Sequence, residues 1–169
     1  DKALFVESVE HDQASLAPYP TIYDQYEMRS ALILEVAAKH GFKPEDFDAV
    51  VARGGLLPRA QAGAYLVTEL LLDTLAHRAQ SDHISNIGAA LAHSIASPLG
   101  RPSYIYDPVT VDELEPIARI TGLKEMERRG PGQKPNMRAG ATQKAQDAGR
   151  AYQDVTYIDV HIGPFLYHI

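Results

Sequence analysis

Three short apolar stretches of the sequence each end in a polar residue that is followed by a glycine- or proline-containing turn. The stretches and the polar residues that follow them are 47–52 with Arg53, 103–106 with Asp107, and 155–160 with His161. Apolar runs bounded by such breakers favour β-strands, and helical patterns lie between them. This order predicts an α/β fold with mostly parallel strands and flanking helices, in which the carboxyl ends of the strands meet at one edge of a sheet.

Apolar residues recur with helical spacing between these stretches. The expected helices cover residues 21–39, 65–78, 83–97 and 137–148. Gly41 and Gly149 suit the left-handed position that ends many helices. In the third helix, we expect the core to be contacted by Ile84, Ile87, Leu91 and Ile95.

Other segments carry weaker patterns. Residues 3–9 alternate loosely between apolar and polar positions, which predicts an edge strand. Thr110 and Glu113 have the spacing of a capping box, so we expect a helix after Pro108, divided in two at Pro116. The glycines and prolines of residues 130–135 predict no regular structure.

The composition excludes several kinds of chemistry. The 169 residues contain no cysteine, which excludes disulfides, thiol catalysis and cysteine-based zinc sites. The net charge of -6 and the lack of a long basic stripe argue against nucleic acid as a partner. No apolar run is long enough to cross a bilayer, so we expect no membrane partner. The absence of cysteine fits a reducing compartment, and we expect a cytoplasmic location.

The strand ends supply the first candidates for chemistry. Arg53 offers a planar fork of donors to a carboxylate or phosphate, and Gly54 and Gly55 would let the backbone approach a ligand. The alternative is a surface arginine before a turn. Asp107 can act as a base, orient a group or hold Mg²⁺ through its oxygens, or it can cap a helix.

Two histidines are further candidates. His161 shares a strand face with Asp159, whose carboxylate would fix its tautomer and favour its protonated form. Such a histidine could stabilise charge on a transferring group, or it could be a half-buried residue bonded to backbone. His83 begins a predicted helix, where backbone N–H groups favour an anion, but it can equally be an exposed first-turn residue.

Five segments together resemble butyrate kinase, a family related to the acetate kinases. They occur in order over nearly the whole chain and cover residues 52–57, 83–89, 106–109, 111–120 and 127–129. The resemblance implies a ribonuclease-H-like domain of the actin-like ATPase type, with residues 1–169 as the N-terminal domain. It also implies transfer of the γ-phosphoryl group of ATP to a short-chain carboxylate, with Mg²⁺.

The resemblance assigns roles to individual residues. The substrate-binding residues that it implies are Arg53, Gly54, Gly55, His83 and Asn86. The catalytic residues are Arg53, Asp107 and His161, with Asp107 also holding Mg²⁺. His161 and Gly163 would contact ATP.

The sequence also departs from that family. The family's first phosphate loop, Asn-Pro-Gly-Ser-Thr-Ser-Thr-Lys, is not found, so we expect the first hairpin to be missing, and the C-terminal domain is not found either. After Gly163, Pro164 removes a donor and Phe165 fills the space that a phosphate needs. Because the first residues already have a strand pattern and the last are apolar, we expect a fragment or an engineered chain.

Two functional hypotheses follow. The first is a short-chain fatty acid kinase domain that phosphorylates butyrate or a branched analogue. The second is a catalytically incompetent domain that acts as a scaffold or binds a carboxylate, a phosphate or a partner without cofactor. The unpaired sheet edges left by a missing hairpin favour self-association into a homo-oligomer.

Overall fold

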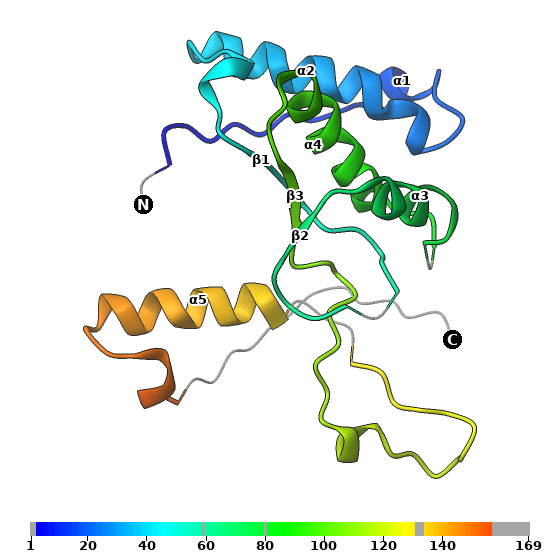
Figure 1. The fold of residues 1–169 in the computed structure, drawn as a ribbon, viewed down its shortest axis with the longest axis vertical. Helices are drawn as coiled ribbons and strands as arrows, with labels where there is room; N and C mark the ends of the chain where they lie inside the picture. Colours follow the sequence, from blue (N-terminus) through cyan, green and yellow to red (C-terminus); the bar gives the residue numbers. More distant parts are fainter. Residues whose placement is uncertain (1–2, 59, 80, 131–133, 157–169) are drawn as a thin grey trace. The chain divides into compact units, whose positions relative to one another are not determined.

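A computed structural model describes residues 3–58, 60–79, 81–130 and 134–156. It shows a small α/β domain in which a three-stranded mixed sheet packs against helices (Figure 1). The chain divides into two compact units, residues 1–132 and 133–169. The sheet belongs to the first unit.

The elements follow one another along the chain as follows. The first unit contains α1 (Gln13–Leu16), α2 (Tyr26–Lys39), β1 (Val50–Arg53), β2 (Ala64–Leu66), α3 (Glu69–His77), α4 (Gly88–Ala96) and β3 (Ser103–Tyr106). Its short 3-10 helices are η1 (Tyr23–Gln25), η2 (Pro44–Asp46), η3 (Ile84–Ile87), η4 (Ser97–Leu99) and η5 (Pro116–Arg119). The second unit contains α5 (Lys134–Asp147) and η6 (Tyr152–Asp154).

The strands lie in the order β1-β3-β2. β1 runs parallel to β3, with Arg53 opposite Tyr106, and this confirms the expected parallel pair. β2 runs antiparallel to β3, with Ala64 opposite Tyr106. The sheet is therefore mixed, and the carboxyl ends of β1 and β3 meet at one edge.

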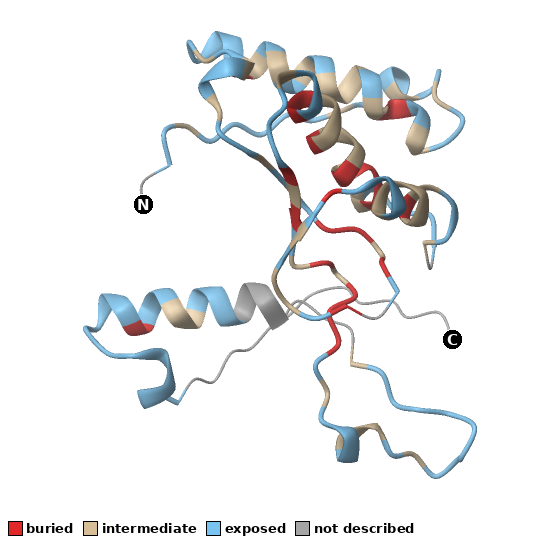
Figure 2. Cartoon of the chain, viewed as in Figure 1, coloured by how far each residue is buried: buried red, intermediate tan, exposed pale blue. Residues whose placement is uncertain are grey.

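The core lies between the sheet and its helices. α3 and α4 pack on one side of the sheet and α2 packs on α4, and the buried residues of the first unit concentrate along β3 and α4 and in the loops that follow β1 and β3 (Figures 1 and 2). Ile105, Ala89 and Leu75, at 0%, 1% and 2% exposure, are the most buried members of a cluster that also contains Leu57 and Val67. Small residues let α4 approach the strands, since a Cβ on Gly88 would lie 2.7 Å from the carbonyl oxygen of Arg53.

The strand predictions are confirmed in part. β3 coincides with the predicted stretch 103–106, and β1 overlaps the stretch 47–52 and includes Arg53. The third predicted strand lies mostly outside the described residues. Residues 65–78 were expected to be helical throughout, but Tyr65 and Leu66 belong to β2. α3 begins only after Thr68, whose hydroxyl caps the helix by accepting a hydrogen bond from the Leu71 N–H.

The helix predictions for 21–39, 83–97 and 137–148 are confirmed in outline by α2, by η3 with α4, and by α5. Gly41 and Gly149 have φ of 81° and 67°, the left-handed conformation expected where a helix ends. α5 begins at Lys134, inside the segment that we expected to be irregular. Ile84 is 43% exposed and does not join the core as predicted.

Two predictions are wrong for identifiable reasons. Residues 3–9 form no strand, because side chains hold this segment instead: the Phe5 ring stacks on His40 at 4.1 Å. No helix starts between Pro108 and Glu115, and the capping box is not formed, since the buried Thr110 hydroxyl has no hydrogen-bond partner among the described residues. Helical structure begins there only at Pro116, in η5.

None of the helices in the described ranges combines the length and the apolar character needed to cross a membrane.

Candidate functional site

The ends of β1 and β3 lie side by side and bring two of the predicted site residues to neighbouring positions. Arg53 lies opposite Tyr106, the residue before Asp107. The Gly54 N–H donates to the Tyr106 carbonyl over 3.1 Å and extends the pairing beyond the strands. The sequence therefore located this edge of the sheet correctly.

Gly54 and Gly55 are needed for the packing of the chain on itself. A Cβ on Gly54 would lie 2.6 Å from the Cα of Pro108, and one on Gly55 would lie 2.8 Å from the Oδ1 of Asn86. Real Cβ atoms do not approach other atoms so closely. The close approach that the sequence assigned to a ligand is made by neighbouring protein segments.

Asn86 fixes the loop that follows Arg53. Its side chain is buried, its Oδ1 accepts from the Leu56 N–H over 2.9 Å, and its Nδ2 donates to the Ser81 carbonyl over 2.9 Å. Both ends of the amide are thus engaged within the protein. Its role in the described structure is to hold the loop rather than to present a free group to a substrate.

His83 lies at the start of η3 and is exposed. Its Nδ1 accepts from the Ser85 N–H over 3.2 Å, which caps the short helix. The Asn86 N–H donates to the His83 carbonyl over 2.9 Å. The structure thus connects His83 to Asn86 through the backbone of η3, while the outer part of the imidazole remains accessible.

Asp107 occupies an unusual backbone position. Its φ of 44° is the only positive value for a non-glycine residue among the described residues. Its N–H donates to the Gly63 carbonyl over 3.0 Å, and its Oδ1 accepts from the Gly63 N–H over 2.7 Å. Because aspartate tolerates this conformation and these bonds stabilise it, Asp107 is held in place with Oδ2 still free of these two contacts.

Arg53 is an exposed cation, and no hydrogen bond or ion pair of its guanidinium is found within the described part of the chain. Its neighbour Ala52 packs on the core, so Arg53 points to the opposite face of the sheet. There it lies next to Tyr106, which is 54% exposed. Tyr106 did not stand out in the sequence, because an aromatic residue in a strand is ordinary until its exposure is known.

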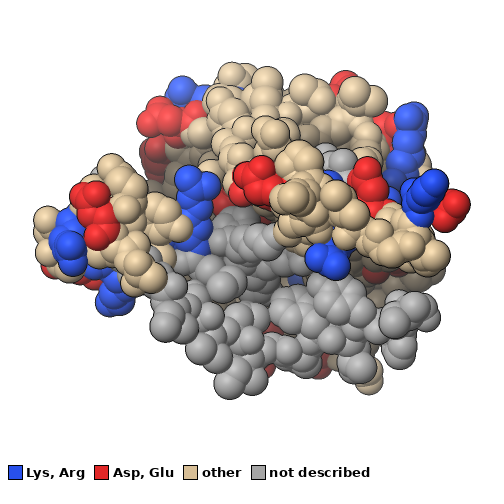
Figure 3. All heavy atoms as spheres, turned by 90° about the horizontal axis from the view of Figure 1, so that it is seen from below, with Lys and Arg blue, Asp and Glu red and all other residues tan. Residues whose placement is uncertain are grey.

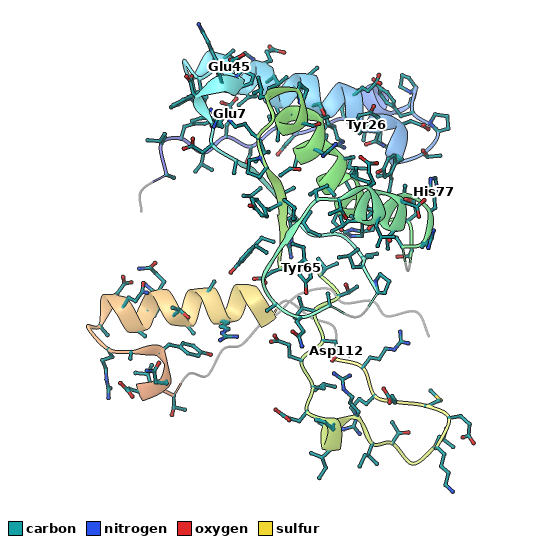
Figure 4. The ribbon with its side chains drawn as sticks, viewed as in Figure 1. Glu7, Tyr26, Glu45, Tyr65, His77 and Asp112 are labelled. Atoms are coloured by element: carbon teal, nitrogen blue, oxygen red, sulfur yellow. The ribbon has the colours of Figure 1, made fainter. Side chains whose placement is uncertain are left out.

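Asp112 and Arg119 form a buried ion pair that the sequence reasoning did not single out. The Arg119 Nη1 lies 2.9 Å from the Asp112 Oδ2, and the two side chains are 14% and 5% exposed. The arginine lowers the pKa of the Asp112 carboxyl to about 2. Asp112 lies beyond the end of β3 (Figure 4), and its N–H donates to the Ala60 carbonyl over 3.0 Å, so it joins the segments that follow β3 and β1.

The described residues contain no group of three or more histidine or acidic side chains suited to hold a metal ion. Asp107 could give one oxygen, which fits Mg²⁺ because this ion commonly keeps several waters and takes its other ligands from phosphates. His161 and Gly163 lie outside the described residues, so their predicted contacts with ATP remain predictions.

Two cavities of about 520 and 460 Å³ lie elsewhere in the first unit. The larger is walled mainly by α2, β1 and residues 5–11, and the smaller by Tyr23, Asn86 and the end of α3. Burial raises the pKa of the Tyr23 phenol. Arg53 and Asp107 line neither of these two cavities.

In Figure 3, acidic and basic side chains of the described residues are interspersed, without a basic stripe on the visible face. The sequence matches no known protein-family model.

Proposed function

We propose that this chain is a carboxylate-binding domain of the butyrate kinase type, with the ribonuclease-H-like fold that this resemblance implies. One observation carries the proposal: Arg53 is an exposed cation without a protein partner in the described residues, and it sits beside Asp107 at the carboxyl end of a parallel strand. Ligands of open α/β sheets bind outside this end of the strands.

The surrounding contacts support a prearranged site. Asn86 holds the loop after Arg53, the Gly63 backbone holds Asp107, and the tight packing of Gly54 on Pro108 joins the two strand ends. A guanidinium carried by a backbone that is held in this way can form two parallel hydrogen bonds with a carboxylate. Fixed geometry of this kind reduces the entropy lost on binding.

The reaction of the parent family is phosphoryl transfer. A carboxylate oxygen forms a bond to the γ-phosphorus of ATP, the bond from that phosphorus to the bridging β,γ-oxygen breaks, and ADP leaves with the bonding electrons. Arg53 would neutralise charge on the acid and on the transferring group, which is the main catalytic requirement of such transfers. Mg²⁺, when bound near Asp107, would neutralise phosphate oxygens, and the resemblance gives His161 and Gly163 to the nucleotide.

Calorimetric titration with butyrate tests the binding step. We expect saturable binding in the millimolar range, because the site is open and the ligand is small, and at least a tenfold loss of affinity in Arg53→Ala. Arg53→Lys should weaken binding less, since it keeps the charge but loses the fork. Arg101→Ala is the matched control, because Arg101 is also partly exposed and pairs only loosely with Asp48 at 3.8 Å. Equal affinities of the wild type and Arg53→Ala would reject the proposal.

A second candidate function is carboxylate or phosphate binding without transfer. One observation favours it: Pro164 and Phe165 stand where the family's phosphate loop has glycines. Trapping of acyl phosphate with hydroxylamine, in the presence of ATP, Mg²⁺ and butyrate, separates the two candidates. Turnover that is lost in Asp107→Asn supports the kinase, and Arg53-dependent binding without turnover supports the binding module.

A further inference from the structure

We propose that the Arg53 site prefers an aromatic monocarboxylate, of the benzoate or phenylacetate class, to a short aliphatic acid. The inference rests on the proposed function, because it places the carboxylate on Arg53. It adds a second contact, between the ring of the ligand and the side chain of Tyr106. This contact follows from the arrangement of residues on the face of the sheet away from the helices.

That face, called the open face below, is built as two rows across the three strands. The row at the carboxyl end of β1 contains Arg53, Tyr106 and Ala64, and the next row contains Val51, Tyr104 and Leu66. Side chains alternate along a strand, and Ala52, Ile105 and Tyr65 between these rows pack on the helix side. The six residues of the two rows therefore share the opposite face.

The open face is exposed in the first unit. Val51, Leu66 and Tyr106 are 60%, 53% and 54% exposed, whereas Ile105, between the rows, is fully buried. α3 and α4 pack on the other side of the sheet, and α2 packs on α4 (Figure 1). An aliphatic and aromatic surface of this kind is a common feature of recognition sites.

The charges on the open face specify the ligand further. Arg53 is the one formally charged side chain of the six residues, and its guanidinium has no partner within the described residues. Paired positions on adjacent strands place Cβ atoms about 5 Å apart. When the negative group of a ligand binds Arg53, the neighbouring atoms of that ligand therefore lie above the side chain of Tyr106. The small Ala64 lies on the far side of Tyr106, and Val51 lies in the next row, on the same strand as Arg53.

A planar ring uses this surface better than a short alkyl chain does. It can stack on Tyr106 in an offset or edge-to-face arrangement, and aromatic pairs of this kind change affinity by up to about tenfold beyond simple burial. Butyrate carries only a short flexible chain and covers less of the same surface. Inorganic phosphate has no apolar part, so it should bind through Arg53 without any dependence on Tyr106.

The experiment compares phenylacetate, butyrate and inorganic phosphate in NMR titrations of the full chain. The variants are Tyr106→Ser, Tyr106→Phe and Arg53→Ala, with Tyr152→Ser as a matched control because Tyr152 is a partly exposed tyrosine of the second unit. The midpoint of urea unfolding shows whether each variant is folded. Because Tyr106 is exposed, its substitution should leave the fold intact.

For the wild type, we expect phenylacetate to bind about fivefold more tightly than butyrate. Tyr106→Ser should reduce this ratio to about one and leave phosphate affinity unchanged, while Tyr106→Phe and Tyr152→Ser should keep the ratio. Equal affinities of the wild type for phenylacetate and butyrate would overturn the inference, and so would a preference for phenylacetate that persists in Tyr106→Ser. In either case the proposed function stands if Arg53→Ala still loses affinity for butyrate. If Arg53→Ala keeps both acids, both proposals fail. A dimer in size-exclusion chromatography that Tyr106→Ser dissociates would show that a second copy covers the open face, which also overturns the inference.

Discussion

The two faces of the sheet in the first unit contrast sharply. On the helix side, Ile105 is fully buried, and Leu75 and Ala89 pack around it. On the open face, Tyr106 comes next after Ile105 in the same strand and is 54% exposed. Adjacent residues of one strand thus belong to different environments, because side chains alternate along it.

The contrast separates residues that the fold explains from residues that it does not. Packing accounts for Ile105, for the close approach of Gly54 to Pro108 and for the two hydrogen bonds of Asn86. No comparable contact in the described residues accounts for the free guanidinium of Arg53 or for the exposed ring of Tyr106. These two residues make the open face the candidate location of a binding site.

The largest expected difference between the faces concerns stability. Ile105→Ala should lower the free energy of unfolding by about 2–5 kcal/mol, because it leaves a cavity in a packed core. Tyr106→Ala should change it by less than about 1 kcal/mol, because that side chain contacts water over half its surface. Urea unfolding followed by circular dichroism measures both. Similar losses in the two variants would show that the open face is covered in solution.

The next effect tests the junction between the strand ends. Gly54→Ala should destabilise the domain by about 1–3 kcal/mol, since the added Cβ would meet backbone atoms of Pro108 that cannot move aside. Gly140→Ala is the control: nothing lies within 4 Å of the added Cβ, and alanine favours the helix by up to about 1 kcal/mol. A neutral Gly54→Ala would mean that β1 and β3 end farther apart than described. Thermal unfolding is a sufficient measurement.

Asn86 provides a prediction of similar or slightly smaller size. Asn86→Ala should cost about 1–3 kcal/mol in the free energy of unfolding, because the part-buried hydrogen bonds of the Asn86 amide with the Leu56 N–H and the Ser81 carbonyl would be lost. Hydrogen exchange at Leu56 should become faster in the variant. An unchanged exchange rate would contradict the role of Asn86 in holding the loop.

The smallest effect is expected with acid. The pKa of Asp112 is lowered from 3.8 to about 2 in the folded chain, mainly by its hydrogen bond with Arg119. A lowered folded-state pKa stabilises the fold above the unfolded value, so this contribution is complete above about pH 4 and is lost as the pH falls toward 2. In Asp112→Asn, the free energy of unfolding should depend less on pH between about pH 4 and pH 2 than in the wild type. Asp48→Asn should not have this effect, because the Asp48 side chain is fully exposed. Parallel pH profiles for wild type and Asp112→Asn would contradict the assignment.

The sequence predicted best where local signals and burial agree. Residues 103–106 contain two tyrosines and an isoleucine, which favour strands, and are bounded by Pro102 and Asp107-Pro108, and they form β3. The helix ends at Gly41 and Gly149 followed from the conformational freedom of glycine. These features depend on near neighbours in the chain, which a sequence displays directly.

The failures concern partners that are distant in the chain. β2 is stabilised by antiparallel pairing with β3, and its three residues resembled the start of a helix because leucines recur after Leu66. Residues 3–9 have a strand pattern, but a pattern does not supply a neighbouring strand. The capping box of Thr110 and Glu113 does not form: the Glu113 carboxylate accepts instead from the Ala62 N–H, which is distant in the chain. For the candidate site, the sequence located Arg53 and Asp107, whereas the role of Asn86 and the exposure of Tyr106 required the fold.

Carboxylate binding at Arg53 is tested most directly by mapping amide chemical-shift changes during titration with butyrate. We expect the largest changes to cluster at Arg53, Tyr106 and Asp107, to saturate with one dissociation constant, and to disappear in Arg53→Ala. Changes that cluster instead around the cavity between α2 and residues 5–11, and that persist in Arg53→Ala, would contradict binding at Arg53.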